Sequence, residues 1–464
     1  MDKALVALYL VLAVFGCMNI YSASITPDQY TIFDLTCNSG KQIMWVGISI
    51  FVGIVVMFMK SNIFDQFAYI FYGLIILLLI ATIFLSSNIK GSRSWLVLGP
   101  ISLQPAEFAK LAAALAVAKM MSEYQFRLSD FRSYLRVVVL FVLPMLIIIM
   151  QKETGTALVF ASFILLLYRE GMSGLIPLLA FVAVLLFVLT IKFSPFWSLI
   201  VIFITQIIFL LRYRRETMAS LIMVGIMVTL LVANHFICKY WINYDSSEWI
   251  MLALNVGAML YMFVRAVQTW RRAYWWIALF IMLSTGFSFS TGYIFDNVLK
   301  PHQQKRIQVV LGIVDDPRGV GYNTNQAQIA IGSGSLWGKG YLKGTQTRLK
   351  YVPEQHTDFI FCTIGEEWGF IGSIVLIAVY VALMWRIVVI AERAEDKFTR
   401  AYAYGLLGFF IFHFSVNIGM VLGLVPVIGI PLPLVSYGGS SFLSFTIMLA
   451  ILLKLDTMRE ERLR

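Results

Sequence analysis

The sequence predicts an all-α integral membrane protein whose chain crosses the bilayer many times. Only 13% of its 464 residues are charged and 60% are hydrophobic, whereas soluble domains are about 25% charged. The mean hydropathy of +0.83 leaves too little polar surface to cover a globule in water, which excludes the soluble classes of protein. The net charge of +11 is typical of loops held at the cytoplasmic face and does not indicate nucleic-acid binding.

Fourteen apolar stretches are long enough to cross the hydrocarbon core as helices. With a cytoplasmic N-terminus, the cytoplasmic loops and termini hold twenty Lys and Arg, and the short outer loops hold six. This bias follows the positive-inside rule, so we expect both termini to be cytoplasmic and the first span to stay uncleaved. The predicted spans are 5–23, 43–60, 67–87, 105–122, 135–150, 155–169, 172–192, 195–212, 217–238, 248–266, 274–291, 358–386, 401–424 and 439–455.

Two outer segments do not fit a simple helical bundle. Residues 292–357 leave the membrane in one long excursion, and structureless loops beyond about 15 residues are uncommon unless they serve a function. The prolines and glycines of residues 425–438 cannot continue a helix, and broken backbone at this depth must be covered by protein or line a water-filled cavity. The sequence therefore places the chemistry at the outer face.

The first candidate for chemistry is the stretch Asp315-Asp316-Pro317 in the long excursion, followed by Gly319 and Gly321. Asp-Pro followed by spaced glycines makes a turn that presents a carboxylate. Either aspartate can simply cap the turn or the next helix, or one of them can act as a general base toward a sugar hydroxyl. The spacing does not choose between these readings.

Other charged and polar residues gather in the remaining outer segments. A glycine-rich basic stretch with Lys339 and Gln346 could hold a phosphate or pyrophosphate, although it matches neither a dinucleotide fingerprint nor a P-loop. Glu107 and Lys110 share one helical face, and charges inside a span cost about 2.5–3.5 kcal/mol each, so they line a cavity or neutralise each other. Together such groups suit an amphiphile with an anionic head. The other candidates are Arg93, Trp95, Glu153, His356, Asp358 and Glu366.

A long series of motifs resembles the SEDS family (shape, elongation, division and sporulation). The resemblance covers about residues 1–192 and 292–455. Gly-Thr-Gln and His-Thr-Asp-Phe are more similar to the elongation branch, typified by RodA, than to the division branch, typified by FtsW. The motifs lie at 93–95, 104–110, 330–334, 344–346, 353–361, 365–367, 417–420 and 429–441.

The resemblance implies a peptidoglycan glycosyltransferase that polymerises lipid II at the outer face of the bacterial inner membrane during cell elongation. By this analogy Asp316 activates the 4-hydroxyl of the acceptor GlcNAc, and undecaprenyl pyrophosphate leaves the donor. Arg93, Lys110 and Lys339 are the cations expected to steady that pyrophosphate. The other positions expected to bind substrate are Trp95, Glu107, Glu153, Gln346, His356, Asp358, Glu366 and Ser436.

The resemblance also implies a partner, a class B penicillin-binding protein whose transpeptidase crosslinks the new glycan. The sequence fixes no required cofactor, although carboxylates beside a diphosphate suit Mg²⁺ or Mn²⁺.

Two departures from the family pattern follow from the same comparison of motifs. Family members usually have ten spans, so the chain divides into seven family-like helices at 1–192, about four inserted helices at 193–291, an extracytoplasmic catalytic loop at 292–357, and three helices with the C-terminus at 358–464. Glu153 also stands where the family has aspartate in Pro-Asp-x-Gly, and it reaches one methylene further.

Two other functions remain open at this level. Buried charges and broken helices suit a flippase that moves lipid II between leaflets, and a scaffold that only anchors the penicillin-binding protein needs no catalytic base. The sequence has no obvious inverted repeat, and its chemistry-rich segments crowd one face. Both features favour the enzyme.

Overall fold

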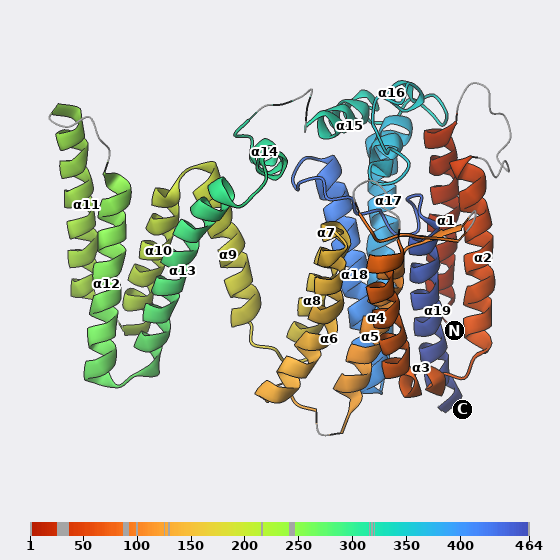
Figure 1. Cartoon of the computed structure of the whole chain (residues 1–464), viewed down its shortest axis with the longest axis horizontal. Helices are drawn as coiled ribbons and strands as arrows, with labels where there is room; N and C mark the ends of the chain where they lie inside the picture. The colour runs from red at the N-terminus through yellow and green to blue at the C-terminus, as the bar shows by residue number, and fades with distance from the viewer. Residues whose placement is uncertain are drawn as a thin grey trace. The chain divides into compact units, whose positions relative to one another are not determined.

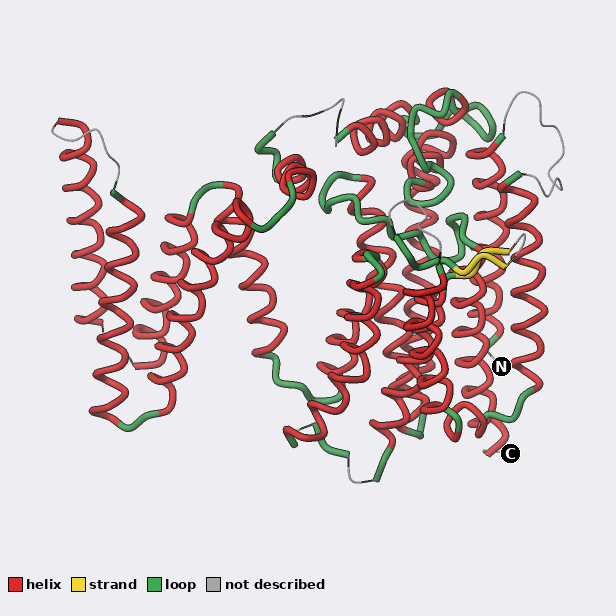
Figure 2. Tube along the Cα trace, in the orientation of Figure 1, coloured by secondary structure: helices red, strands yellow, loops and turns green. Residues whose placement is uncertain are grey.

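A computed structural model describes residues 2–25, 37–86, 92–98, 101–124, 126–128, 130–214, 217–240, 246–314, 316, 319 and 321–462. The chain forms two compact units. Unit 1 comprises Met1–Ser173 and Tyr322–Arg464, and unit 2 comprises Gly174–Gly321. Helices dominate both units (Figure 2), which confirms the predicted all-α class.

Unit 1 is a bundle in which segments far apart in sequence pack together. Helix α19 packs on α2, α5 packs between α4 and α18, and α17 packs on α1 and α18. The short helices α15 and α16 contact α17 and lie over one of its ends (Figure 1). The elements are α1 (Lys3–Ser24), α2 (Asn38–Phe58), α3 (Asn62–Gln66), α4 (Ala68–Leu85), β1 (Leu96–Leu98), β2 (Ile101–Leu103), α5 (Pro105–Ser122), α6 (Phe131–Met150), α7 (Thr154–Val159), η1 (Phe160–Ser162), α8 (Phe163–Arg169), α15 (Tyr322–Ser333), α16 (Thr345–Arg348), α17 (Ile360–Arg393), α18 (Lys397–Val421) and α19 (Gly439–Arg462).

Unit 2 has a core of its own. Buried apolar side chains such as Leu199, Met251 and Ile281 form one cluster. Inside it, Gln206 donates a hydrogen bond of 2.8 Å to Asn255, so these buried amides are paired. The elements are α9 (Leu175–Lys192), α10 (Pro195–Phe209), η2 (Leu210–Arg214), α11 (Thr217–Tyr240), α12 (Ser247–Thr269), α13 (Arg272–Asn297) and α14 (Pro301–Val310).

Twelve helices of the described chain are long and apolar enough to cross a membrane. The two other predicted spans are also helical but fall short of that standard. Residues 105–122 form α5, which starts at Pro105 as expected for a first helical turn but is less apolar. Residues 155–169 are divided among α7, η1 and α8. The protein is therefore a multi-pass membrane protein.

The boundaries of the two units differ from the predicted division of the sequence. The predicted division places residues 172–192 with the first seven helices, whereas α9 packs on α10 and α13 within unit 2. The predicted division at 192, 291 and 357 separates family-like from inserted segments, and it stays a prediction.

A short hairpin that the sequence analysis did not predict precedes α5. Strands β1 and β2 are antiparallel, with Leu96 opposite Leu103 and Val97 opposite Ser102. The hairpin connects the Arg93–Trp95 segment to the start of α5, so two of the family-like motifs are joined by regular structure.

Candidate active site

Asp316 lies in a tight turn of unit 2, six residues after the end of α14. Its carboxylate Oδ2 is 2.8 Å from Nζ of Lys305, and the Asp316 side chain is 18% exposed. The backbone N–H groups of Gly319 and Gly321 donate to the Asp316 carbonyl at 3.3 and 3.2 Å. The turn therefore presents a partly exposed carboxylate that is held by a cation. Asp315, the alternative base, lies outside the described residues.

The turn requires glycine where it passes the carboxylate. A Cβ added to Gly319 would lie 2.2 Å from Asp316 Oδ2, and one added to Gly321 would lie 2.9 Å from the Asp316 carbonyl oxygen. We expect Gly319→Ala to push the carboxylate aside, because a side chain yields more easily than backbone. Glycan polymerisation should fall about tenfold or more while the melting temperature changes little. Equal activity of Gly319→Ala and wild type in a gel assay would contradict this.

Glu366 of α17 is the centre of a second cluster, in unit 1. Its fully buried carboxylate is 2.7 Å from Lys339 Nζ. It also accepts the backbone N–H groups of Gln346 and Thr347, each at 2.8 Å, and the Thr345 and Thr347 hydroxyls at 3.1 and 2.6 Å. A buried carboxylate is costly unless it is paired and hydrogen-bonded. Glu366 thus anchors the loop of residues 339–347, which we name the anchored loop.

The anchored loop is also fixed to α1. The Tyr341 hydroxyl donates to the Met18 carbonyl at 3.1 Å. Burial raises the pKa of Tyr341 to about 12, with the Glu367 carboxylate and the Tyr21 phenol as further causes. The phenol therefore stays protonated and keeps this bond at any physiological pH. Gly344 allows the close approach, since a Cβ there would lie 2.9 Å from Glu366 Oε2.

Glu107 and Lys110 pair as predicted, and both are buried inside the bundle. Lys110 Nζ lies 2.8 Å from Glu107 Oε2 and 3.0 Å from His413 Nε2. Nδ1 of His413 lies 3.0 Å from the Pro431 carbonyl oxygen. The Lys110 ammonium lies 4.9 Å from the centre of the Phe445 ring. Lys110 has no exposed side-chain surface. This geometry suits a structural pair, and a contact of Lys110 with pyrophosphate stays a prediction.

Glu153 joins the Arg93 segment to the turn between α6 and α7. Its Oε1 accepts hydrogen bonds from Ser92 at 3.0 Å and Ser94 at 2.6 Å. The Arg93 N–H donates to the Gln151 carbonyl at 3.1 Å, and the Arg93 side chain is exposed. Trp95 follows, half-buried, just before β1. Glutamate at 153 therefore holds the segment that carries Arg93.

Residues 425–438 have no helix, as predicted. The segment folds on itself where Leu432 N–H donates to Ser436 Oγ at 2.9 Å. It packs tightly on α7, because a Cβ on Gly155 would lie 2.3 Å from the Ile428 carbonyl oxygen. The Pro-rich backbone is therefore covered by protein, as broken backbone in a membrane protein must be.

The same segment gathers His356 and Asp358. Tyr437 N–H donates to the His356 carbonyl at 2.8 Å, and the two rings lie 5.5 Å apart. The Asn417 amide bridges the Asp358 and Ile430 carbonyls at 2.8 and 2.7 Å. The hydrogen bonds are accepted by the backbone carbonyls of His356 and Asp358, so they fix the positions of these residues. A contact of either side chain with substrate stays a prediction.

The predicted site residues thus fall into groups within each unit. Asp316 belongs to unit 2, and the predicted binding residues belong to unit 1. Gln346 contributes its backbone N–H to Glu366. The sequence analysis missed Lys305 and Thr347. Lys305 lies eleven residues before Asp316, and no sequence spacing connects them. The sequence signal for Thr347 is the Gly-Thr-Gln-Thr stretch at 344–347, whose hydroxyl and backbone N–H groups can bind a buried carboxylate such as Glu366.

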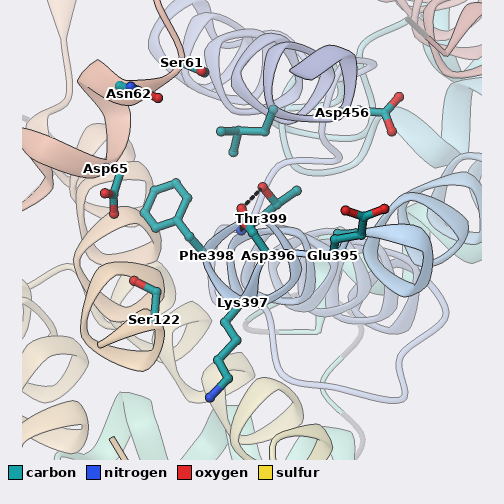
Figure 3. A pocket seen from close by; sticks show the side chains of 12 residues that line it. Ser61, Asn62, Asp65, Ser122, Glu395, Asp396, Lys397, Phe398, Thr399 and Asp456 are labelled. Carbon is teal, nitrogen blue, oxygen red and sulfur yellow. Dashed lines mark hydrogen bonds between the residues drawn. The ribbon is translucent and has the colours of Figure 1, made fainter. Parts of the chain in front are cut away.

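A hollow of about 340 Å³ lies in unit 1 at the ends of α18, α3 and α5 and beside Asp456 of α19 (Figure 3). Its acidic groups are used by the chain itself. Asp396 caps α18 through Thr399, Asp65 pairs with Lys119 at 3.0 Å, and Asp456 pairs with Arg393. Within the described residues, no group of three or more His, Cys, Asp and Glu side chains could hold a metal ion.

Comparison with known proteins gives consistent matches over the whole chain. A family model described as a cell cycle protein (FtsW, RodA, SpoVE) matches residues 2–221 and 216–461. The peptidoglycan glycosyltransferase RodA of Treponema pallidum is 30% identical over 98% of this chain and 97% of its own length. The peptidoglycan glycosyltransferase MrdB of Escherichia coli is 28% identical over 99% of this chain and 94% of its own length.

Solved structures support the fold. The rod shape determining protein RodA of Thermus thermophilus matches with a TM-score of 0.55 and 20% identity, covering 99% of this chain and 97% of that one. A chain from a study of polymerization and crosslinking by a peptidoglycan synthase complex matches with a TM-score of 0.62 and 22% identity, covering 99% and 98%. The resemblance inferred from the motifs is confirmed: the chain belongs to the FtsW/RodA/SpoVE family of cell cycle proteins.

Proposed function

We propose that this protein is a peptidoglycan glycosyltransferase of the elongation type, which polymerises lipid II. The names of its relatives support the activity. The observation that carries the proposal is the turn at Asp316, where Lys305 lies 2.8 Å from the carboxylate and two glycines give it room. A carboxylate held in this way suits a general base whose position must be defined.

In the proposed reaction Asp316 accepts the proton of the acceptor's GlcNAc 4-hydroxyl. The freed oxygen attacks C1 of the donor MurNAc, so the new O4–C1 bond forms as the bond from C1 to pyrophosphate breaks. Undecaprenyl pyrophosphate leaves with the electron pair, and Asp316 later gives its proton to solvent. The lysine beside Asp316 keeps the carboxylate in place between turnovers.

The leaving group develops negative charge, and fixed cations stabilise such charge most. Arg93, with an exposed side chain, is the cation best placed to reach a ligand. Lys339 is partly exposed at 26% and could exchange Glu366 for phosphate, whereas Lys110 would first have to leave its buried pair. Mg²⁺ or Mn²⁺ remains a proposal as an auxiliary cation.

The proposal includes a location and a partner. The long segment before α17 and the Asp316 turn would face the outside of the bacterial inner membrane, with both termini in the cytoplasm, as the distribution of Lys and Arg indicates. A class B penicillin-binding protein would crosslink the product. The likeness to a chain from a peptidoglycan synthase complex supports such an assembly.

The test is polymerisation of labelled lipid II by the purified protein with a class B penicillin-binding protein whose transpeptidase is blocked by a β-lactam. We expect a ladder of glycan chains on a gel. No polymer from a folded, partner-bound protein would overturn the proposal. Transfer of lipid II across vesicle membranes without polymer formation would favour the flippase. The absence of both activities would favour the scaffold.

A further inference from the structure

Helix α17 is interrupted at Gly369. The φ and ψ of this residue are 67° and −163°, a conformation that is open to glycine and costly for other residues. A break of this kind takes backbone N–H and C=O groups out of the helical pattern. In a membrane span each such group costs several kcal/mol if it stays unpaired.

Residues 335–340, which we name the inserted segment, pair these groups. They belong to the loop between α15 and α16, which lies beside one end of α17 (Figure 1). Two N–H groups of α17 after the break and two of its carbonyls before the break form hydrogen bonds with the backbone of the inserted segment. The bonds run from Phe370 N–H to Ser335 O, Ile371 N–H to Leu336 O, Lys339 N–H to Glu366 O and Gly340 N–H to Glu367 O, with lengths of 3.0–3.1 Å.

The fit between the inserted segment and α17 is close. A Cβ added to Gly338 would lie 2.1 Å from the Glu367 carbonyl oxygen, and one added to Gly369 would lie 2.2 Å from the Gly338 nitrogen. Both contacts are with backbone, which cannot move aside cheaply. The segment is therefore seated in the break with its backbone hydrogen-bonded to the helix, so the break does not depend on water.

The tip of the inserted segment is apolar and exposed. Leu336 and Trp337 are 60% and 79% exposed. The neighbouring surface of α17 is exposed in the same way, with Phe370 at 59%, Ile374 at 47% and Val375 at 56%. Because α17 is among the membrane-spanning helices, this surface of α17 meets lipid. The hydrogen bond from Ile371 N–H to the Leu336 carbonyl places the tip next to this lipid-facing surface, so the two form one apolar surface.

The length of α17 sets the depth of this tip. From Phe370 to Arg393 a helix rises about 35 Å at 1.5 Å per residue, and the hydrocarbon core is about 30 Å thick. With Arg393 among the headgroups at one face, Phe370 reaches the boundary of the hydrocarbon at the other. Tryptophan is enriched at this boundary, because its ring is apolar and its N–H is polar.

We propose that Leu336 and Trp337 insert into the bilayer at the boundary between headgroups and acyl chains, so that the inserted segment is a lipid-contacting anchor for the loop. The partner is the phospholipid surface itself. The proposal is independent of the glycosyltransferase activity, because it rests on the helix break and the exposed surface alone.

The test places a fluorophore at the tip. Trp337→Cys, in a background whose four native cysteines are alanine, is labelled with an environment-sensitive probe and reconstituted in vesicles of phosphatidylcholine and phosphatidylglycerol. A matched label goes on Arg348→Cys, an exposed position at the end of α16. Nitroxide lipids labelled near the glycerol should quench the probe at 337 at least about threefold more than at 348.

Two results would overturn the proposal and place the tip in water. One is equal quenching at the two positions, and the other is a thiol at position 337 that reacts with a membrane-impermeant reagent as fast as the thiol at position 348. If the cysteine-free background does not fold, the native chain is compared with Trp337→Phe in brominated phosphatidylcholine. The emission of the native chain minus that of Trp337→Phe reports Trp337, and the brominated lipid should quench this part of the emission. An unquenched difference would also overturn the proposal.

Discussion

Asp316→Asn is expected to abolish glycan polymerisation, lowering the rate by about 10²–10⁴-fold, the usual contribution of a general base. The asparagine amide keeps the size of the side chain but cannot accept the hydroxyl proton. Because the protein should stay folded, lipid II binding and the melting temperature are expected to be close to wild type. The measurement is the initial rate of polymer formation on a gel with labelled lipid II.

Two comparisons make the result specific. Asp296→Asn changes an exposed aspartate near the end of α13 and should retain full activity. Lys305→Met removes the cation 2.8 Å from Asp316 and should cost about tenfold, less than loss of the base. Full activity of Asp316→Asn, combined with an inactive Asp315→Asn, would move the base to the preceding residue. Full activity of both variants would remove the general base from the mechanism.

Glu366→Ala is expected to release the anchored loop. The substitution removes a fully buried carboxylate together with its bonds to Lys339, Thr345, Gln346 and Thr347. Breaking a buried charge network of this kind costs about 3–5 kcal/mol. Trypsin should then cleave after the exposed Arg348 and Lys350 at least about tenfold faster in detergent, and polymerisation should fall with it.

This experiment separates an anchor from a direct substrate ligand. If Glu366 only contacts substrate, activity falls while the trypsin rate stays that of wild type. Lys339→Met, which leaves the backbone and hydroxyl bonds to Glu366, should give an intermediate trypsin rate. Lys343→Met removes an exposed lysine of the same loop and should match wild type in both measurements.

Long apolar helices were predictable from sequence because their length and composition are local properties. Pro105 begins α5 as expected, and the Pro-rich residues 425–438 interrupt helix as expected. The span predicted at 358–386 extends to Arg393, because the apolar residues 387–391 continue the helix after Arg386.

The remaining features depend on partners distant in sequence. Gly369 reads as one tolerated glycine in an apolar helix, and its break is stable only because Ser335 and Leu336 accept the freed N–H groups. The carboxylate of Glu366 looks like a substrate ligand until the turn of residues 345–347 is folded against it. Lys305 could not be matched to Asp316, because α14 and the turn meet only in three dimensions.

The packing of unit 1 has a consequence for biogenesis. Helices α1 and α2 pack on α17 and α19, and residues 174–321 of unit 2 are synthesised between them. At about 5–20 residues per second, the chain between the end of α1 and the start of α17 takes roughly 17–67 s to synthesise, and α1 waits that long for its partner. Unit 2 has its own core and can assemble during this interval. The early helices must therefore persist in the bilayer as an incomplete bundle, which makes them the natural clients of any insertion factor that shields polar surface.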